Sequence, residues 1–451
     1  MIEPVVIKVV SGGNGEELLL LLTGPREFND GWMLTPLGAK PGDAPFNLLG
    51  TRPLEADVVR RCGQQLGDAL NRNQAVSEMF GFIATANAEE EYPIYIEVGS
   101  PESENLPWEA IWRDQLEFLS LKRHWPIARL AATTNDVTPK ERTVQPTLKI
   151  LAVLAAAGVD ATGEWMRLYD AVRRHGARVR VHVLVAQREL RAQIQGLGDP
   201  RFTAEWVGDT TSLMRRVQNF GPNLVHFFCH GLSEASPKLQ LVQRSGKTEE
   251  ISLHDLTGLA VPESIWLVTL NCCQGGRASG NVRSIARQLV ARGVPAVVAM
   301  RESVESFDAN LFTGAFYDVL TESIMQYLPS DPVAPDAEPT AMPESVWLRA
   351  LQPSRQAIHE ALRGDPPSKY LPADMVQWTL PMLYVRRGGL TLKPTALTHD
   401  ADLEGQVNIH SELTQLRDAR RQLTGLGMPA EALKLIDDKI ADLEQQVQKV
   451  D

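Results

Sequence analysis

The chain has 451 residues, a net charge of −11 and a hydrophobic fraction of 43%, which predicts a soluble protein of two or three domains with a well-developed core. Its acidic balance argues against nucleic-acid binding, because a protein that neutralises phosphates needs a basic face. No signal peptide, no apolar run long enough to span a bilayer and no disulfide framework among the four cysteines can be recognised, so we expect a cytoplasmic protein without membrane association.

Residues 1–135 have the pattern of an N-terminal α/β half. Strands are predicted at Val5–Val10, Leu18–Leu22 and Tyr92–Glu97, and a helix at Ala56–Asn71. The stretch 131–146 is polar and rich in threonine, and it contains Pro139 and Pro146. Because this composition is typical of connecting segments, we expect a domain boundary here.

From residue 147 to about 386, predicted strands and helices alternate. The strands are Leu148–Ala157, Arg178–Ala186, Leu224–Phe228, Ser264–Cys272 and Val294–Met300. The helices are Glu164–His175, Arg188–Gln195, Val282–Ala291, Ser306–Leu320 and Ser345–Leu362. Several strands are near-continuous apolar runs, which are typical of strands covered by helices on both faces, and the alternation predicts a parallel or mixed sheet. Met375–Val385 is predicted to add a late strand to the same sheet.

The C-terminal part of the chain changes in character. Residues 329–343 are acidic and contain five prolines, so we expect a mobile loop that is either a flexible excursion or a site of self-cleavage. Residues 387–404 are predicted to form a linker. Two helices with one apolar stripe each are predicted in 405–451, and this helical hairpin either docks on a regulatory protein partner or folds back on the body of the protein.

Two strand ends carry the candidate chemistry. The first reads Val225-His-Phe-Phe-Cys-His-Gly231, and the second reads Val268-Thr-Leu-Asn-Cys-Cys-Gln-Gly275. Ligand sites of open α/β sheets form at the carboxyl ends of strands, so His230 and Cys273 are expected to meet there. An imidazole can take the proton of a thiol and later protonate the leaving amine. The backbone N–H groups of Gly231 and Cys273 are then candidates for an oxyanion hole.

The choice of nucleophile depends on the strand face that each cysteine occupies. Side chains alternate along a strand, so Cys272 and Cys273 are expected to point to opposite faces. Cys272 shares its face with residues of core character, which are Leu270, Val268 and Trp266. Cys273 shares its face with Asn271 and Thr269 and lies nearer the strand end, so Cys273 is the predicted nucleophile.

These strand ends resemble the two motifs of the CHAT domains, which are caspase-like proteases related to separases. His226-Phe-Phe-Cys-His-Gly231 resembles the histidine motif. Leu270-Asn-Cys-Cys-Gln-Gly275 resembles the cysteine motif, in which the nucleophile is the fourth residue, here Cys273. The segment 284–300, Pro107-Trp108-Glu109 and Trp378–Tyr384 extend the resemblance over roughly residues 1–386.

The resemblance implies a caspase-like, mixed and mostly parallel sheet flanked by helices, with a catalytic domain at 147–386 and a pseudo-caspase-like half at 1–135. It also implies a cysteine endopeptidase with a His–Cys dyad, protein substrates and no metal or other cofactor. In bacteria such proteases resemble effectors of antiviral defence and cell death that cleave partners such as gasdermins, and we expect a regulated enzyme of this type.

Three further residues are expected to contact the substrate by the same resemblance. Relatives that cut after basic residues often carry an aspartate two positions before the nucleophile, where this chain has Asn271, so we predict a neutral residue before the cleaved bond. Arg301 and Glu302 begin a stretch that lacks the Trp-Pro pair often found in the family, and this loop is expected to shape the substrate pocket.

Other functions stay open beside the protease. A non-catalytic adaptor would recruit partners through a caspase-like body and the hairpin 405–451, although it would need neither His230 nor Cys273. A thiol oxidoreductase would use Cys272 and Cys273, but neighbouring cysteines form a disulfide only with strain. A zinc site built from Cys229, His230, Cys272 and Cys273 is disfavoured, because adjacent cysteines that point in opposite directions cannot readily share one ion.

Overall fold

The fold is that of a computed structural model of the 451-residue chain. The chain forms two compact units: residues 1–328 with 338–393, and residues 329–337 with 394–451. The structure describes residues 4–12, 17–24, 34–38, 57–85, 90–114, 116–131, 138–233, 237–260, 262–272, 282–302, 304–330, 333–334, 337–363, 372–395, 416, 419–420, 423 and 430–448.

One large sheet forms the centre of the first unit. Its strands are β1 (Val5–Ser11), β2 (Glu17–Thr23), β3 (Thr35–Pro36), β4 (Ile94–Val98), β7 (Ile127–Ala131), β9 (Leu148–Leu154), β10 (Val179–Val185), β11 (Phe202–Trp206), β12 (Leu224–Ser233), β13 (Pro237–Val242), β14 (Thr248–Ser252), β15 (Leu267–Cys272), β16 (Ala296–Met300) and β18 (Pro381–Val385). Over the described residues their order is β11-β10-β9-β12-β15-β16-β18-β7-β4-β1-β2-β3, with the hairpin β13–β14 attached to β12. Strands of both predicted domains therefore share one sheet.

The sheet contains two runs of parallel strands that point in opposite directions. Strands β11, β10, β9, β12, β15 and β16 are mutually parallel, and so are β18, β7, β4 and β1. The two runs meet where β16 and β18 pair antiparallel, with Val298 opposite Leu383. The predicted late strand thus belongs to the sheet, but only Pro381–Val385 is extended, because Pro372–Thr379 forms a 3-10 helix.

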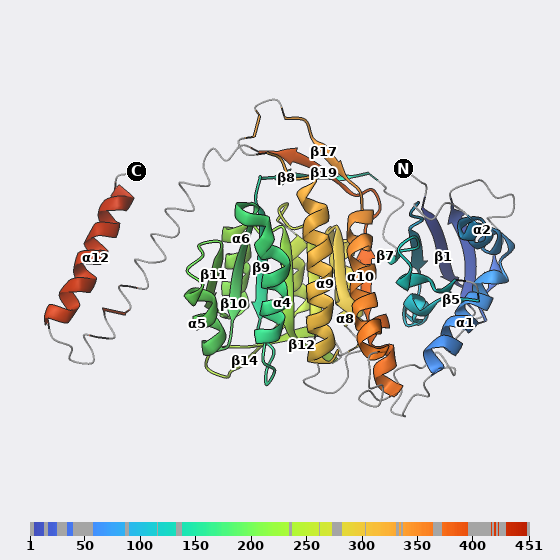
Figure 1. The fold of residues 1–451 in the computed structure, drawn as a ribbon, viewed down its shortest axis with the longest axis horizontal. Helices are drawn as coiled ribbons and strands as arrows, with labels where there is room; N and C mark the ends of the chain where they lie inside the picture. Colours follow the sequence, from blue (N-terminus) through green and yellow to red (C-terminus); the bar gives the residue numbers. More distant parts are fainter. Residues whose placement is uncertain are drawn as a thin grey trace. The chain divides into compact units, whose positions relative to one another are not determined.

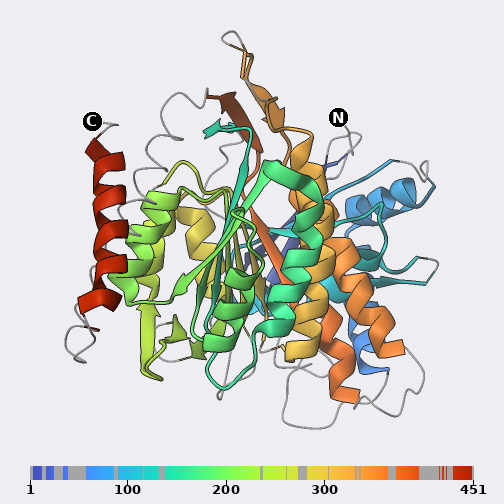
Figure 2. The same cartoon turned by 60° about the vertical axis from the view of Figure 1, so that its left-hand side comes forward.

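Helices cover both faces of this sheet (Figures 1 and 2). They are α1 (Val58–Asn71), α2 (Gln74–Thr85), α3 (Pro101–Glu104), α4 (Thr162–Val172), α5 (Arg188–Gly196), α6 (Thr210–Phe220), α7 (Leu253–Leu256), α8 (Val282–Arg292), α9 (Ser306–Met325) and α10 (Ser345–Arg363). One core cluster includes apolar residues of α4 and α9, and a second includes those of α6 and α8. Every residue of β15 and β16 is buried between the two layers, including the polar Thr269 and Asn271 of β15, while β16 is the continuous apolar run that such burial predicts.

Helices α1 and α2 pack in the N-terminal half. The helix predicted at Ala56–Asn71 is α1, which approaches the backbone after the Trp108–Ala110 turn so closely that a Cβ atom at Gly63 or Gly67 would clash with a carbonyl oxygen. Helix α2 is absent from the predicted elements. The side chain of Asn73 caps it, since its Oδ1 accepts the N–H of Val76 at 3.1 Å.

Short strands occupy two segments that were predicted to be irregular. β8 (Lys140–Val144) lies within the predicted boundary, and β17 (Thr340–Met342) lies at the end of the predicted mobile loop. Both pair with β19 (Leu390–Pro394) in a separate sheet of order β17-β19-β8. The prediction of a mobile loop is therefore wrong for residues 340–342, because their backbone groups bond to a strand made later in the chain.

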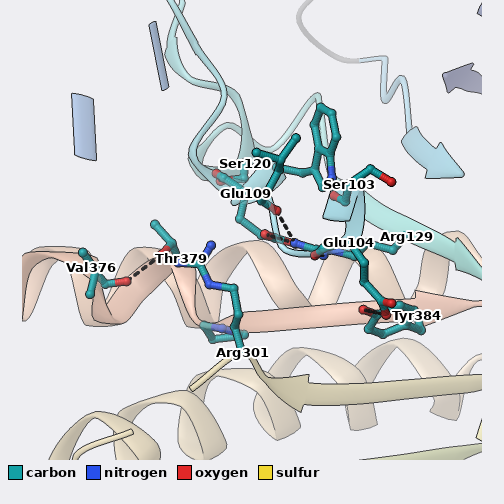
Figure 3. Close-up of polar contacts among 12 residues, drawn as sticks. Ser103, Glu104, Glu109, Ser120, Arg129, Arg301, Val376, Thr379 and Tyr384 are labelled. Carbon is teal, nitrogen blue, oxygen red and sulfur yellow. Dashed lines mark hydrogen bonds and ion pairs between the residues drawn. The ribbon is translucent and has the colours of Figure 1, made fainter. Parts of the chain in front are cut away.

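A buried ion pair lies beside the junction of the two runs of strands (Figure 3). Arg129 of β7 and Glu109 are 0% and 1% exposed, and Nη2 of Arg129 lies 2.7 Å from Oε2 of Glu109. Arg129 lies opposite Tyr384 of β18, whose hydroxyl donates a hydrogen bond of 2.7 Å to Oε1 of Glu104. Polar contacts inside the core therefore accompany the pairing of β18 with the N-terminal half.

The second unit contains the predicted helical hairpin. Helix α12 (Ala430–Gln448) corresponds to the second predicted helix, and the described residues of the first one, which are Leu416, Ala419, Arg420 and Leu423, are helical. Arg420 forms an ion pair with Asp437 of α12, with Nη2 lying 3.1 Å from Oδ2. The predicted apolar stripe of α12 is partly or fully buried at Leu433, Ile436, Ile440 and Leu443. The domain bounds at 387–404 and 405–451 stay predictions.

Candidate active site

The imidazole of His230 lies near the carboxyl end of β12 and is only 3% exposed. Its Nε2 atom lies 2.7 Å from the carbonyl oxygen of Ala157. A carbonyl oxygen can only accept a hydrogen bond, so Nε2 is the donor and carries the proton. In the neutral ring the lone pair then belongs to Nδ1, which makes Nδ1 the nitrogen able to act as a base.

The Ala157 carbonyl belongs to the loop that follows β9, and this loop is fixed by several contacts. The N–H of Ala155 donates to the carbonyl of Phe228 at 2.9 Å. Gln187 bonds to the loop twice, donating from Nε2 to the Val159 carbonyl at 2.7 Å and accepting the N–H of Ala161 at 3.1 Å. These bonds hold the partner of His230 in one position.

The second candidate strand, β15, lies directly beside β12. The two strands are parallel, and Cys229 is in register with Cys272. The last described residue of this strand is Cys272, whose carbonyl accepts the N–H of Val304 at 3.3 Å, just before α9 begins. Cys273 itself lies outside the described residues, so its role as nucleophile stays a prediction.

Side chains of β15 alternate between the two helical layers. Val268, Leu270 and Cys272 belong to the core cluster on the side of α6 and α8, as the strand-face argument predicts. Asn271 contacts α4 and α9 on the opposite side. Trp266 was predicted to share the face of Cys272, but it belongs to the other cluster. The reason is that β15 begins only at Leu267, so the alternation does not extend to Trp266.

The cysteines of the described part of the chain are Cys62, Cys229 and Cys272, and all three are buried thiols outside any disulfide. Burial raises the pKa of the Cys62 thiol to about 12, against a smaller opposing effect of Arg301. A thiol with such a pKa stays protonated at neutral pH and is a poor nucleophile. In the described part, no group of three or more His, Cys, Asp or Glu side chains could hold a metal ion, and no helix there is long and apolar enough to cross a membrane.

A comparison with protein families matches the CHAT domain to residues 60–327, which is more than half of the chain. The chain belongs to the CHAT domain family. The family that the two strand-end motifs predicted is thereby confirmed. The matched CHAT region includes β12, β15, α4 and α9 and ends before α10 and β18.

Solved structures similar to this CHAT protein include two of the separase–securin complex of Saccharomyces cerevisiae. The first has a TM-score of 0.37 and 12% sequence identity, and the match covers 73% of this chain and 18% of the separase chain. The second has a TM-score of 0.36 and 12% identity, and it covers 72% of this chain and 17% of that one. This chain thus spans less than a fifth of the length of the separase chains that it matches. A comparison with curated proteins found no match.

Two of the residues predicted to contact substrate are wholly buried in the CHAT protein. Asn271 is 0% exposed and its amide points towards α4 and α9. Arg301 is 0% exposed, and its Nη2 donates to Oγ1 of Thr379 at 3.1 Å (Figure 3). Glu302 and Gly231 are half-buried, and Gly231 lies opposite Leu239 of β13. A direct contact of these residues with substrate or oxyanion stays a prediction.

The sequence reasoning missed a buried carboxylate close to this part of the CHAT domain. Glu164, in the first turn of α4, is wholly buried and accepts hydrogen bonds from β12, β15 and α9. A signal was present, because Glu164 starts the predicted helix Glu164–His175. Acidic residues are common in the first turn of a helix, however, because they interact favourably with the helix dipole. The sequence alone therefore does not distinguish a buried Glu164 from an ordinary exposed one.

Proposed function

We propose that this CHAT protein is a cysteine endopeptidase in which Cys273 is the nucleophile and His230 the general base and acid. His230 Nδ1 takes the thiol proton of Cys273, and the thiolate attacks the carbonyl carbon of the scissile amide. The N–H groups of Gly231 and Cys273 stabilise the oxyanion. The imidazolium then protonates the leaving amine, and a water molecule hydrolyses the thioester to release the second product.

One observation carries this proposal, and it is the register of β12 with β15. Cys229 is paired with Cys272 in parallel strands, and His230 and Cys273 are the residues that come next in the sequence after this pair. The hydrogen bond from Nε2 of His230 to the Ala157 carbonyl supports the tautomer that a base requires. The family resemblance of both motifs supports the same two residues.

The test is cleavage of a diverse peptide library by the purified protein in the presence of EDTA, with and without prior treatment with iodoacetamide. We expect cleavage that survives EDTA and is lost after alkylation, because the thiolate rather than a metal supplies the nucleophile. The site of alkylation is identified by mass spectrometry. A protein that cleaves no peptide, and whose Cys273 reacts no faster than a free cysteine, would instead be the non-catalytic adaptor.

The same library tests the neutral residue predicted before the cleaved bond. That prediction comes from Asn271, which stands where relatives that cut after basic residues often have an aspartate. We expect leucine-containing peptides to be cut at least as well as arginine-containing ones. Cleavage of arginine peptides alone would contradict the prediction. The carboxylate of Glu164, which accepts a hydrogen bond from Asn271, would then be the candidate for binding the basic side chain.

The hairpin 405–451 is proposed as a docking element for a regulatory protein partner. The support is the sequence pattern, since each of the two predicted helices carries an apolar stripe and such a stripe needs a covering surface. Deletion of residues 400–451 should abolish partner recruitment or regulation in cells while leaving the CHAT domain folded. Recruitment and regulation that are both unchanged by the deletion would mean that the hairpin only packs on its own chain.

The biological setting follows from the family resemblance alone. We propose a regulated effector in bacterial defence or cell death that processes a partner of the gasdermin type in the cytoplasm. Co-expression of the protein with candidate partners, followed by mapping of any new N-termini, tests this setting. Cuts that depend on Cys273 in one such partner are expected.

A further inference from the structure

Four buried polar residues form a cluster between α4, β12, β15 and α9, and Glu164 is at its centre. All four are 0% exposed: Glu164 of α4, His226 of β12, Asn271 of β15 and Thr313 of α9. Oε1 of Glu164 lies 2.8 Å from Nε2 of His226, 2.7 Å from Nδ2 of Asn271 and 2.6 Å from Oγ1 of Thr313. A single carboxylate oxygen therefore accepts hydrogen bonds from three different elements of the fold.

The proton positions in this cluster follow from the chemistry of its groups. The amide of Asn271 can only donate from Nδ2, and it donates to Oγ1 of Thr313 at 3.1 Å as well as to Glu164. The hydroxyl of Thr313 then directs its own proton to Glu164. The position of Glu164 in the first turn of α4 also favours a negative charge, because the N-terminus of a helix is the positive end of its dipole.

One member of the cluster shares a strand and a strand face with His230. His226 and His230 are four positions apart within β12, and residues separated by an even number of positions share a face. On the neighbouring strand, Asn271 precedes Cys272, the last residue of β15, and Cys273 comes next in the sequence. Glu164 therefore bonds to both strands that lead into the two predicted motifs.

We propose that Glu164 is a positioning residue that sets the distance between His230 and Cys273. It bonds to both strands at once, so a sliding of β15 along β12 would break bonds of a buried carboxylate. Its third bond, to Thr313, attaches the same oxygen to α9. The inference rests on the proposed dyad, and it assigns Glu164 a role that acts through the positions of β12, β15 and α9.

The test compares two variants of α9 that each remove one buried hydroxyl. Thr313→Val removes a donor to Glu164, whereas Tyr317→Phe removes a hydroxyl that bonds to Oγ1 of Thr269 at 3.4 Å instead. We expect Thr313→Val to lower kcat roughly tenfold with little change in KM, because small displacements of reacting groups reduce the rate strongly. Tyr317→Phe should leave kcat within about threefold of the wild type, since it leaves the bonds of Glu164 intact.

Variants of Glu164 itself extend the test. In Glu164→Gln the side-chain carbonyl can still accept all three bonds, so kcat should stay close to the wild-type value, whereas Glu164→Ala should lose about 10- to 100-fold. An equal loss in both variants, together with a changed preference for the residue before the cleaved bond, would overturn the proposal in favour of direct substrate contact. If the alanine variant does not fold, the pair on α9 still decides the question.

A second readout does not depend on turnover. The rate of alkylation of Cys273 by iodoacetamide reports the reactivity of its thiolate, which depends on the distance to His230. We expect slower alkylation in Thr313→Val than in Tyr317→Phe. If the wild type cleaves no peptide of the library, the ratio of the two alkylation rates still tests the positioning role. Equal alkylation rates in wild type and Thr313→Val would refute that role.

Discussion

Replacing Cys273 with alanine should abolish peptide-bond cleavage, with kcat/KM falling by on the order of 10⁴-fold or more. The alanine side chain can form no covalent intermediate, and the remaining oxyanion hole and binding contacts supply only a small residual rate. The measurement is the initial rate of cleavage of the best library peptide. Comparing the unfolding of the variant with that of the wild type checks that the variant is folded.

Cys272→Ala is the matched control for this experiment, because it removes the neighbouring thiol from a buried position. Cys272 faces the core cluster beside α6 and α8 rather than the α4 and α9 side. Its loss should reduce stability by about 1 kcal/mol through the small cavity that is left, while activity stays within a few-fold of the wild type. A reversal, with Cys272→Ala inactive and Cys273→Ala active, would exchange the roles of the two cysteines.

Replacing Arg129 with methionine should lower the free energy of unfolding by about 3–5 kcal/mol, because it leaves the buried Glu109 carboxylate without its partner. Arg129 and Glu109 are almost inaccessible to water, so no solvent can replace the lost interaction. The double variant Arg129→Met/Glu109→Leu should recover much of this loss, since it removes the charge as well. Denaturation in urea, followed by tryptophan fluorescence, measures all three proteins.

An exposed ion pair provides the control for the buried one. Lys238 and Glu250 pair at 2.8 Å on the hairpin β13–β14, where both side chains are partly exposed to solvent. Lys238→Ala should change stability by less than about 1 kcal/mol. An equally small change in Arg129→Met would show that the buried pair does not contribute to stability.

The same ion pair predicts how stability depends on pH. Burial by itself raises the pKa of the Glu109 carboxyl, but the charges of Arg129, Arg355 and Arg301 outweigh burial and hold this pKa below its ordinary value of 4.5. A carboxyl with a lowered pKa stabilises the folded state above its unfolded-state pKa and loses that effect as the pH falls through the folded-state value. Stability should therefore decline as the pH falls below about 4.5, and this decline should be smaller in Arg129→Met, because the Glu109 carboxyl loses the charge that contributes most to lowering its pKa.

The sequence predicts the central strands well because strands that are buried on both faces consist mainly of apolar residues. The apolar runs at Leu148–Ala157 and Val294–Met300 correspond to β9 and β16, which lie inside the sheet. Strands with weaker patterns were not predicted. β11 is an edge strand and is buried only in part, and β7 carries the charged Arg129, whose burial depends on a partner twenty residues away. Helix α2, in contrast, had a detectable signal in the cap residue Asn73 and the apolar spacing that follows it.

The residues of the candidate site were predictable only where a reactive residue type lies at the end of a recognisable strand. His230 and the face of Cys272 follow from the strand pattern. The bonds of Glu164 to His226 and Asn271 join residues 62 and 107 positions apart, and no local pattern connects them. Arg301 is likewise buried against a distant part of the chain, where it donates a hydrogen bond to Thr379 of the 3-10 helix before β18.

The location of β18 has a consequence for how the protein is made. This five-residue strand joins the two halves of the sheet, yet it is synthesised after both β7 and β16. Until residues 381–385 leave the ribosome, the nascent chain has two unpaired strand edges, which are sites of aggregation. The pairing of β18 with β7 and β16 can therefore form only late in translation. A premature stop before residue 381 would release a polypeptide in which the edges of β7 and β16 stay unpaired and prone to aggregation.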